Sequence, residues 1–97
     1  MPMSQGKFQA LNSLGAYLGA LKNIEKVKQG VDAIIKFRDA VPEGFKNQTD
    51  PFINGVILQG IITKKEEQLK SAPDDAKLKE LVEYIKSKLP AADKKGF

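Results

Sequence analysis

The sequence lacks cysteine and histidine altogether, and it has a single arginine, Arg38. Without cysteine there is no disulfide framework and no thiol nucleophile. Without histidine the commonest general base and the commonest side-chain metal ligand are missing. Zinc signatures built on histidine and cysteine are therefore excluded for this chain. We expect it to contain no catalytic residue, no metal ligand and no cofactor-binding residue.

Long hydrophobic runs are also missing. The most apolar stretch covers residues 52–62 and is interrupted by two glycines, an asparagine and a glutamine. A membrane-spanning helix needs about 20 apolar residues. The first seven residues contain no apolar core of a secretion signal. The sequence therefore predicts no membrane span, and it does not distinguish a cytoplasmic from a periplasmic location.

Charge, in contrast, is abundant and evenly mixed. The 97 residues carry 16 basic and 12 acidic side chains, with a net charge of +4, and 41% of residues are hydrophobic. These values are typical of one small globular domain. Nucleic-acid-binding proteins usually show a one-sided basic patch in which arginine is prominent. Here nearly all basic residues are lysines interleaved with acids, so we interpret them as solvated helix faces and expect no nucleic-acid partner.

Apolar residues recur every three or four positions along most of the chain, as in amphipathic helices. The pattern predicts an all-α fold class, with four antiparallel helices arranged as two HEAT-like helical hairpins. The expected helices cover about residues 5–21, 24–41, 51–70 and 73–89, and residues 90–97 form a tail. A strand over residues 55–63 is the alternative, because β-branched residues are frequent there. We favour a helix, since a helix-start signal precedes this segment and a charged helical pattern follows it.

Helix ends carry recognisable signals. Asn23 suits the N-cap of the second helix. Asp50 and Pro51 suit the N-cap and first position of the third helix, after a turn-rich loop at residues 42–48. Ser71 and Asp74 have the spacing of a capping box for the fourth helix.

The two predicted hairpins differ in their apolar faces. The helix at 73–89 has a narrow apolar stripe, which suits an outermost position, whereas the helix at 5–21 is apolar over about half of its circumference. In stacked helical hairpins the terminal unit has a polar outer face. The hairpins are offset by about 45 residues, within the period of HEAT-type repeats. We therefore expect a piece of a longer chain, the last unit of a helical stack whose N-terminal side docks onto another surface.

Small and acidic residues have structural explanations in the sequence. Gly15 and Gly19 have a spacing that lets helices approach closely, and we interpret them as tight packing between helices. Gly55 and Gly60 receive the same interpretation. Each weakens its helix by about 1 kcal/mol relative to alanine, and we expect a neighbouring helix to cross at these positions. The acidic pairs at 66–67 and 74–75 are explained by helix capping and by ion pairs four residues apart, Glu66 with Lys70 and Asp75 with Lys79.

Four residues are candidates for contacts with another domain: Tyr17, Phe37, Arg38 and Phe45. Arg38 lies within the apolar stripe of the second helix. Its side chain either reaches along that surface to the last helix carbonyls or forms an interdomain ion pair or a contact with a ligand carboxylate. The three aromatic residues lie off the main stripes and either close the loop or contribute to a docking surface.

Four stretches resemble the C-terminal helical domain of aminopeptidase N-like zinc metallopeptidases, especially the larger bacterial forms. They are residues 5–17 (QGKFQALNSLGAY), 31–37 (VDAIIKF), 50–58 (DPFINGVIL) and 84–90 (YIKSKLP). The resemblance implies a HEAT-like or armadillo-like helical stack that packs on the catalytic domain and helps to enclose the substrate chamber. The family's zinc-binding H-E-x-x-H motif lies in another domain and has no counterpart here.

The resemblance therefore implies a non-catalytic C-terminal domain. Its partner would be the catalytic domain of the parent chain, where zinc is expected, and it would meet peptide substrates only indirectly. This chain is not expected to be an enzyme, whereas the resembled parent is a zinc metallo-aminopeptidase. The alternative is a stand-alone helical protein–protein interaction module.

Overall fold

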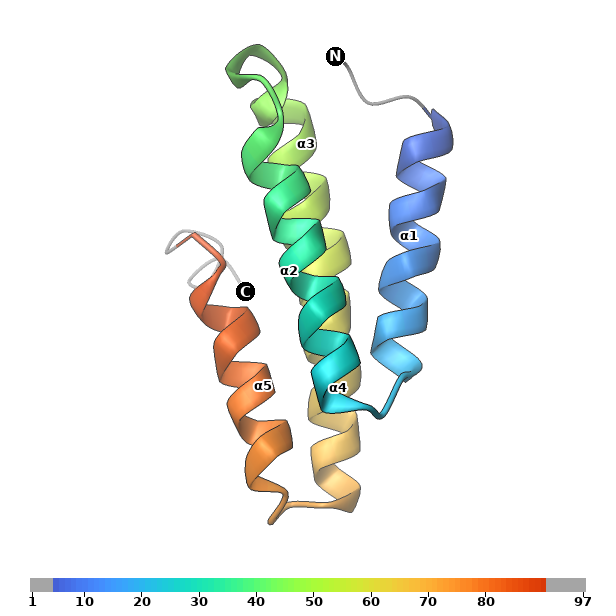
Figure 1. The fold of residues 1–97 in the computed structure, drawn as a ribbon, viewed down its shortest axis with the longest axis vertical. Helices are drawn as coiled ribbons and strands as arrows, with labels where there is room; N and C mark the ends of the chain where they lie inside the picture. The colour runs from blue at the N-terminus through green and yellow to red at the C-terminus, as the bar shows by residue number, and fades with distance from the viewer. Residues whose placement is uncertain (1–4, 91–97) are drawn as a thin grey trace.

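The computed structural model describes residues 5–90, and every regular element within them is helical. This confirms the predicted all-α fold class. Two helices come first, and a long helical run built from a 3₁₀ turn, two α-helices and a π-helix precedes the last helix (Figure 1). The elements are α1 (Gln5–Ala20), α2 (Ile24–Ala40), η1 (Glu43–Phe45), α3 (Lys46–Phe52), η2 (Ile53–Leu58), α4 (Gln59–Ser71) and α5 (Ala76–Ser87). The predicted tail, except Pro90, lies outside the described residues.

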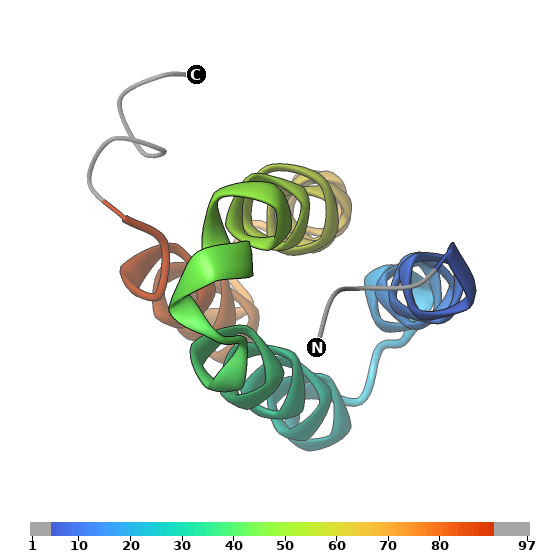
Figure 2. The same ribbon diagram turned by 90° about the horizontal axis from the view of Figure 1, so that it is seen from above.

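The helices form two hairpins that lie side by side. In Figure 1, α1 and α2 run in opposite directions, as do α4 and α5. Seen from above, α1 and α5 lie on opposite sides of a central pair formed by α2 and the long helical run (Figure 2). Contacts join α1 to α4 and α2 to α5, so corresponding helices of the two hairpins are neighbours. They run in the same direction in the view of Figure 1.

The core is centred on the long helical run. Its middle is apolar almost all round, which predicts a central helix, and the structure confirms this position. The fully buried side chains there are Ile53, Ile57, Leu58, Ile61 and Ile62. Around them pack Val27, Val31 and Ile34 from α2, and Leu78, Leu81, Val82 and Ile85 from α5. The first helix adds one large buried side chain, Leu18.

The long helix begins earlier than the sequence predicts. The expected loop at 42–48 is mostly helical, because the Phe45 N–H donates to the Pro42 carbonyl (2.9 Å) and the turn continues directly into α3. Asp50 is therefore not an N-cap, and Pro51 lies inside the helix. A proline there removes one backbone hydrogen bond. The wider π-helical segment η2 follows two residues later.

The caps of the other helices are a mixture of confirmed and wrong predictions. Asn23 caps α2 as predicted, and its side chain accepts a hydrogen bond from the Lys26 N–H (3.1 Å). The capping box of Ser71 and Asp74 is wrong, because Ser71 is the last residue of α4. The chain needs a turn before it reverses direction, with the Asp75 N–H bonded to the Ala72 carbonyl (3.1 Å). Asp75 is thus the residue that caps α5, by accepting from the Leu78 N–H (3.0 Å).

The two predicted ion pairs within helices are replaced by other contacts. Glu66 pairs with Lys86 of α5 (3.1 Å) rather than with Lys70, which is a tertiary contact. Asp75 directs its carboxylate to the Leu78 N–H rather than to Lys79, which is the local N-cap described above.

Candidate functional site

The first helix packs closely against the long helix at two glycines. A Cβ atom on Gly15 would lie 3.2 Å from Ile57 Cγ2, and one on Gly19 would lie 3.1 Å from Lys64 Cγ. Both glycines are buried against the long helix, which confirms that their spacing serves tight helix packing. This explains much of the broad apolar face of α1, since it packs on α2 as well as on η2 and α4.

The glycines of the long helix behave differently. A Cβ atom on Gly55 or Gly60 would meet no atom within 4 Å outside its own helix backbone. The prediction that a neighbouring helix of this chain crosses there is therefore wrong. Gly60 is exposed, beside the half-exposed Val56. The long helix carries these two flexible residues without any packing within the chain that requires them.

Lys65 is a buried lysine. The sequence pattern predicts instead that it belongs to the charged end of the third predicted helix, which faces solvent. Its side chain is fully buried. Its Nζ donates to the carbonyls of Gly19 (3.2 Å) and Leu21, at the C-terminal end of α1, and Gln68 Nε2 also donates to the Gly19 carbonyl (3.0 Å). A cation stabilises that end of a helix, and burial lowers the pKa of Lys65. The signal was present in the sequence, because Lys65 follows the buried Ile61 at helical spacing.

Arg38 joins three elements of this chain. Its Nη1 donates to the Asn54 side chain (2.8 Å) and to the Lys88 carbonyl (2.8 Å), and its Nε pairs with Asp39 (3.1 Å). Its guanidinium therefore meets a carbonyl at the C-terminal end of α5 rather than of its own helix. The last carbonyls of α2 are bonded instead by Lys46 Nζ. These bonds account for Arg38 within the chain, although they do not test a contact with another domain.

The four predicted contact residues do not form one surface. Phe37, Arg38 and Phe45 lie where α2 ends, whereas Tyr17 lies in the last turn of α1, which leads to the start of α2. Phe37 is half-buried and packs against the core, and Phe45 is half-buried in the turn η1. Tyr17 is 58% exposed. Among these residues, Tyr17 is the one whose side chain is mainly available to a partner.

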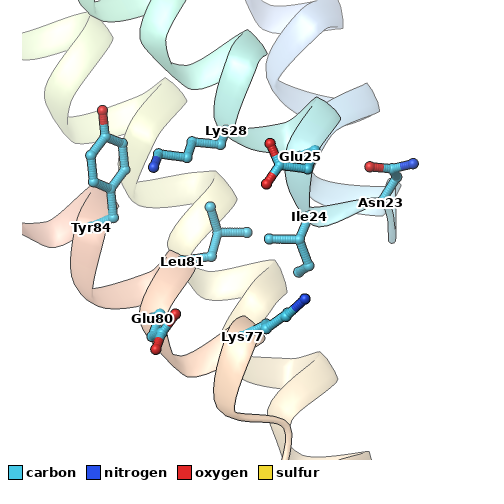
Figure 3. A pocket seen from close by; sticks show the side chains of 8 residues that line it. All are labelled: Asn23, Ile24, Glu25, Lys28, Lys77, Glu80, Leu81 and Tyr84. Atoms are coloured by element: carbon cyan, nitrogen blue, oxygen red, sulfur yellow. The ribbon is translucent and has the colours of Figure 1, made fainter.

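A pocket of about 370 Å³ lies between α2 and α5. Figure 3 shows Ile24 and Leu81 facing each other there, with charged side chains around them. The Tyr84 hydroxyl donates to the Asp32 carboxylate, and this hydrogen bond is the main cause of the raised pKa of Tyr84. Lys28 Nζ lies 4.7 Å from the centre of the tyrosine ring. The two glutamates of the pocket, Glu25 and Glu80, come from different helices and do not converge as an acid–base pair would require.

The most distinctive surface is built from two segments that carry no charged residue, and we call it the uncharged flank. It consists of the exposed faces of residues 8–21, in and just after α1, and of residues 51–63 in the adjoining long helix; neither segment contains a charged residue. Elsewhere α2, α4 and α5 expose lysines and acids. Between the two segments lies an apolar groove of about 180 Å³. It is lined by Asn12, Gly15, Ala16, Val56, Ile57, Gly60 and Lys64.

Comparison with protein-family models, curated proteins and solved structures gave no match to this chain. In the part of the chain that the structure describes, no three acidic side chains are grouped so that they could hold a metal ion. None of the helices described is both long and apolar enough to cross a membrane. Among the surfaces described above, we take the uncharged flank as the candidate site, because a low content of charged residues is a feature of protein contact surfaces.

Proposed function

We propose that this chain is a non-catalytic helical domain that packs against another protein surface through its uncharged flank. The observation that carries the proposal is the contrast in charge between this flank and the rest of the surface. Cores of protein interfaces are depleted in charged residues and enriched in aromatic residues. Tyr17 is 58% exposed and Val56 is 51% exposed, and each lies within one of the two uncharged segments.

The finer proposal is that the surface it packs against is the catalytic domain of an aminopeptidase N-like zinc peptidase. Its support is the resemblance of residues 5–17, 31–37, 50–58 and 84–90 to the C-terminal domain of that family. The side-by-side hairpins, with corresponding helices in contact, are compatible with one unit of a helical stack. The domain would help to shape the substrate chamber, and the zinc and the catalytic groups would belong to the parent's other domain.

The alternative proposal is a stand-alone interaction module that binds a separate protein through the same flank. The gene decides between the two proposals. A reading frame that continues upstream of Met1 for several hundred residues into an H-E-x-x-H motif supports the peptidase domain. A ribosome-binding site directly before Met1 supports the separate module.

The docking role itself is tested with an added charge. Ser13→Arg places a cation in the middle of the flank at an exposed position, and Gln29→Arg places the same charge on the exposed face of α2. With the catalytic polypeptide encoded upstream as the partner, we expect Ser13→Arg to weaken binding by about tenfold or more, since a charge buried at an interface is costly. The matched control should bind as the parent sequence does. Equal affinities for both variants would contradict docking through α1.

A further inference from the structure

The groove between α1 and the long helix has the size of a side chain rather than of a small-molecule ligand. Its volume is about 180 Å³, whereas pockets for drug-sized ligands occupy about 300–1,000 Å³. Its lining is mainly apolar, with Ala16 on one wall and the half-exposed Val56 on the other. A groove of this kind matches the ridges that side chains form on a packing helix.

Gly60 leaves space in this groove that no residue between 5 and 90 fills. Gly15, which also lines the groove, is in close contact with Ile57, but a Cβ atom on Gly60 would meet no atom within 4 Å. Glycine in a helix interior lowers helix stability relative to alanine. An external helix that approaches the backbone at Gly60 supplies the packing that the chain itself does not.

Charge limits what that helix can carry. Lys64 is the charged residue that lines the groove, and it is 64% exposed. Its ion pair with Glu67 is long, at 4.0 Å, and exposed, so it leaves the cation available to a stronger partner. A second copy that packed through the same flank would bring uncharged residues and its own Lys64 to this position, whereas an acidic side chain would complement Lys64.

The area of the flank also disfavours a second copy. Residues 8–21, the longer segment of the flank, span about 21 Å along the helix axis, and two helices are about 20 Å wide, so the flank covers about 420 Å². Stable interfaces between separate proteins bury about 800 Å² on each partner. Interfaces between domains of one polypeptide bury about 600–1,500 Å² in total. The flank is therefore large enough for a neighbouring domain and small for a free homodimer.

From these observations we infer that the groove at Ala16 and Gly60 receives an aliphatic side chain from a helix of an adjoining protein domain, whose acidic residue lies opposite Lys64. The inference rests on the proposed docking function and adds the partner's chemistry to it. It also gives the exposed side chain of Val56 and the open backbone at Gly60 a common role.

The experiment uses the whole chain, labelled with ¹⁵N, and three synthetic 18-residue helical peptides. The first presents an uncharged stripe with a central leucine and a glutamate one turn away. The second has lysine in place of the glutamate, and the third has alanine in place of the leucine. We expect the first peptide to shift the amide resonances of Ala16, Val56 and Gly60, and to bind about threefold or more tightly than either of the others at low salt.

Substitutions at the two open glycines provide the decisive contrast. Gly60→Ala should lower the unfolding equilibrium constant of the free chain by about fivefold, because it restores helix propensity without a clash, and yet weaken peptide binding. Gly60→Leu fills the groove and should weaken binding by about tenfold or more. Gly55→Ala is the matched control, since Gly55 is equally open but does not line the groove. It should stabilise the chain and leave binding unchanged.

Three results would overturn the inference: no shifts at the groove, equal binding of the glutamate and lysine peptides, or a concentration-dependent dimer whose contacts map to the groove in sedimentation and resonance measurements. If Ser13→Arg instead binds the upstream polypeptide as tightly as the parent sequence does, the docking function as a whole is overturned. If Ser13→Arg weakens binding to the upstream polypeptide but neither Gly60 variant does, docking stands and the groove is not where the partner's helix enters.

Discussion

The first and the last helix are attached to the same central pair by different means. The last helix, α5, buries a stripe of branched and aliphatic side chains that includes Leu81 and Ile85, and its outer face is charged. The first helix, α1, buries Leu18 and two glycines, and its C-terminal end is bonded by Lys65 and Gln68. Beyond Lys7 in its first turn, its exposed residues are uncharged. The last helix is held by a fully buried apolar stripe, whereas the first combines partly buried apolar side chains with close backbone approach and a polar cap.

Under the proposed docking function, this difference leaves one side of the domain for a partner. A charged outer face keeps α5 in water. The outer face of α1 has neither the charges that favour water nor the bulk of a core, which is the composition expected of a contact surface. The comparison also predicts that the two helices differ in how independently they open.

The largest effect is expected from truncating the stripe of α5. Ile85 is fully buried, so Ile85→Ala should lower the free energy of unfolding by about 2–5 kcal/mol in urea denaturation.

Leu18→Ala should act more locally, since Leu18 is the single large buried side chain of α1. Hydrogen exchange should then become faster in α1 before it does so in α2, α4 and α5. Faster exchange of α5 than of α1 in this variant would reverse the comparison.

A smaller loss is expected when the polar cap of α1 is removed. Lys65→Met keeps most of the buried stem but takes away the donor to the Gly19 and Leu21 carbonyls, which should cost about 1–3 kcal/mol. The neighbouring Lys64→Met changes an exposed lysine and should alter stability by less than about 0.5 kcal/mol. Similar losses at both positions would show that the buried amine does not hold α1.

The effect of Lys65→Met has a predicted pH dependence. Because burial lowers the pKa of Lys65 below its ordinary value of 10.5, the unfolded chain binds more protons than the folded chain between the two values. The stability linked to Lys65 is therefore fully present above pH 10.5 and is lost as the pH falls through the lowered pKa. The difference in unfolding free energy between the parent sequence and Lys65→Met should grow as the pH rises towards 10.5.

The smallest effect is expected at the link between α2 and α5. Tyr84→Phe removes the hydroxyl that donates to Asp32 but keeps the ring beneath Lys28, and we expect it to lower stability by less than about 1 kcal/mol because the bond is exposed. The hydrogen bond to Asp32 raises the pKa of Tyr84 above 10.0. Its contribution is thus present below pH 10.0 and lost as the pH rises through the raised pKa, opposite in sign to that of Lys65. A pH-independent difference between the parent and Tyr84→Phe would contradict this assignment.

Helix existence and the central position of the third predicted helix could be inferred from the sequence, because the apolar period is a local property of the chain. The N-cap at Asn23 followed from residue type alone. Cap assignments at Asp50 and Ser71 failed because several adjacent residues could each cap a helix, and the choice depends on where the neighbouring turn ends. Gly55 and Gly60 were misjudged because a glycine in a helix does not reveal whether another helix packs against it.

The sequence by itself determined that this protein is helical, that it has no histidine or cysteine for chemistry, and that two of its segments carry no charge, since these follow from composition and local period. Tertiary structure decided that the two uncharged segments lie side by side. It also decided that Lys65 is buried on the end of α1 and that Arg38 bonds to the end of α5. Each depends on contacts between residues far apart in the chain, which helix packing creates and local pattern does not contain.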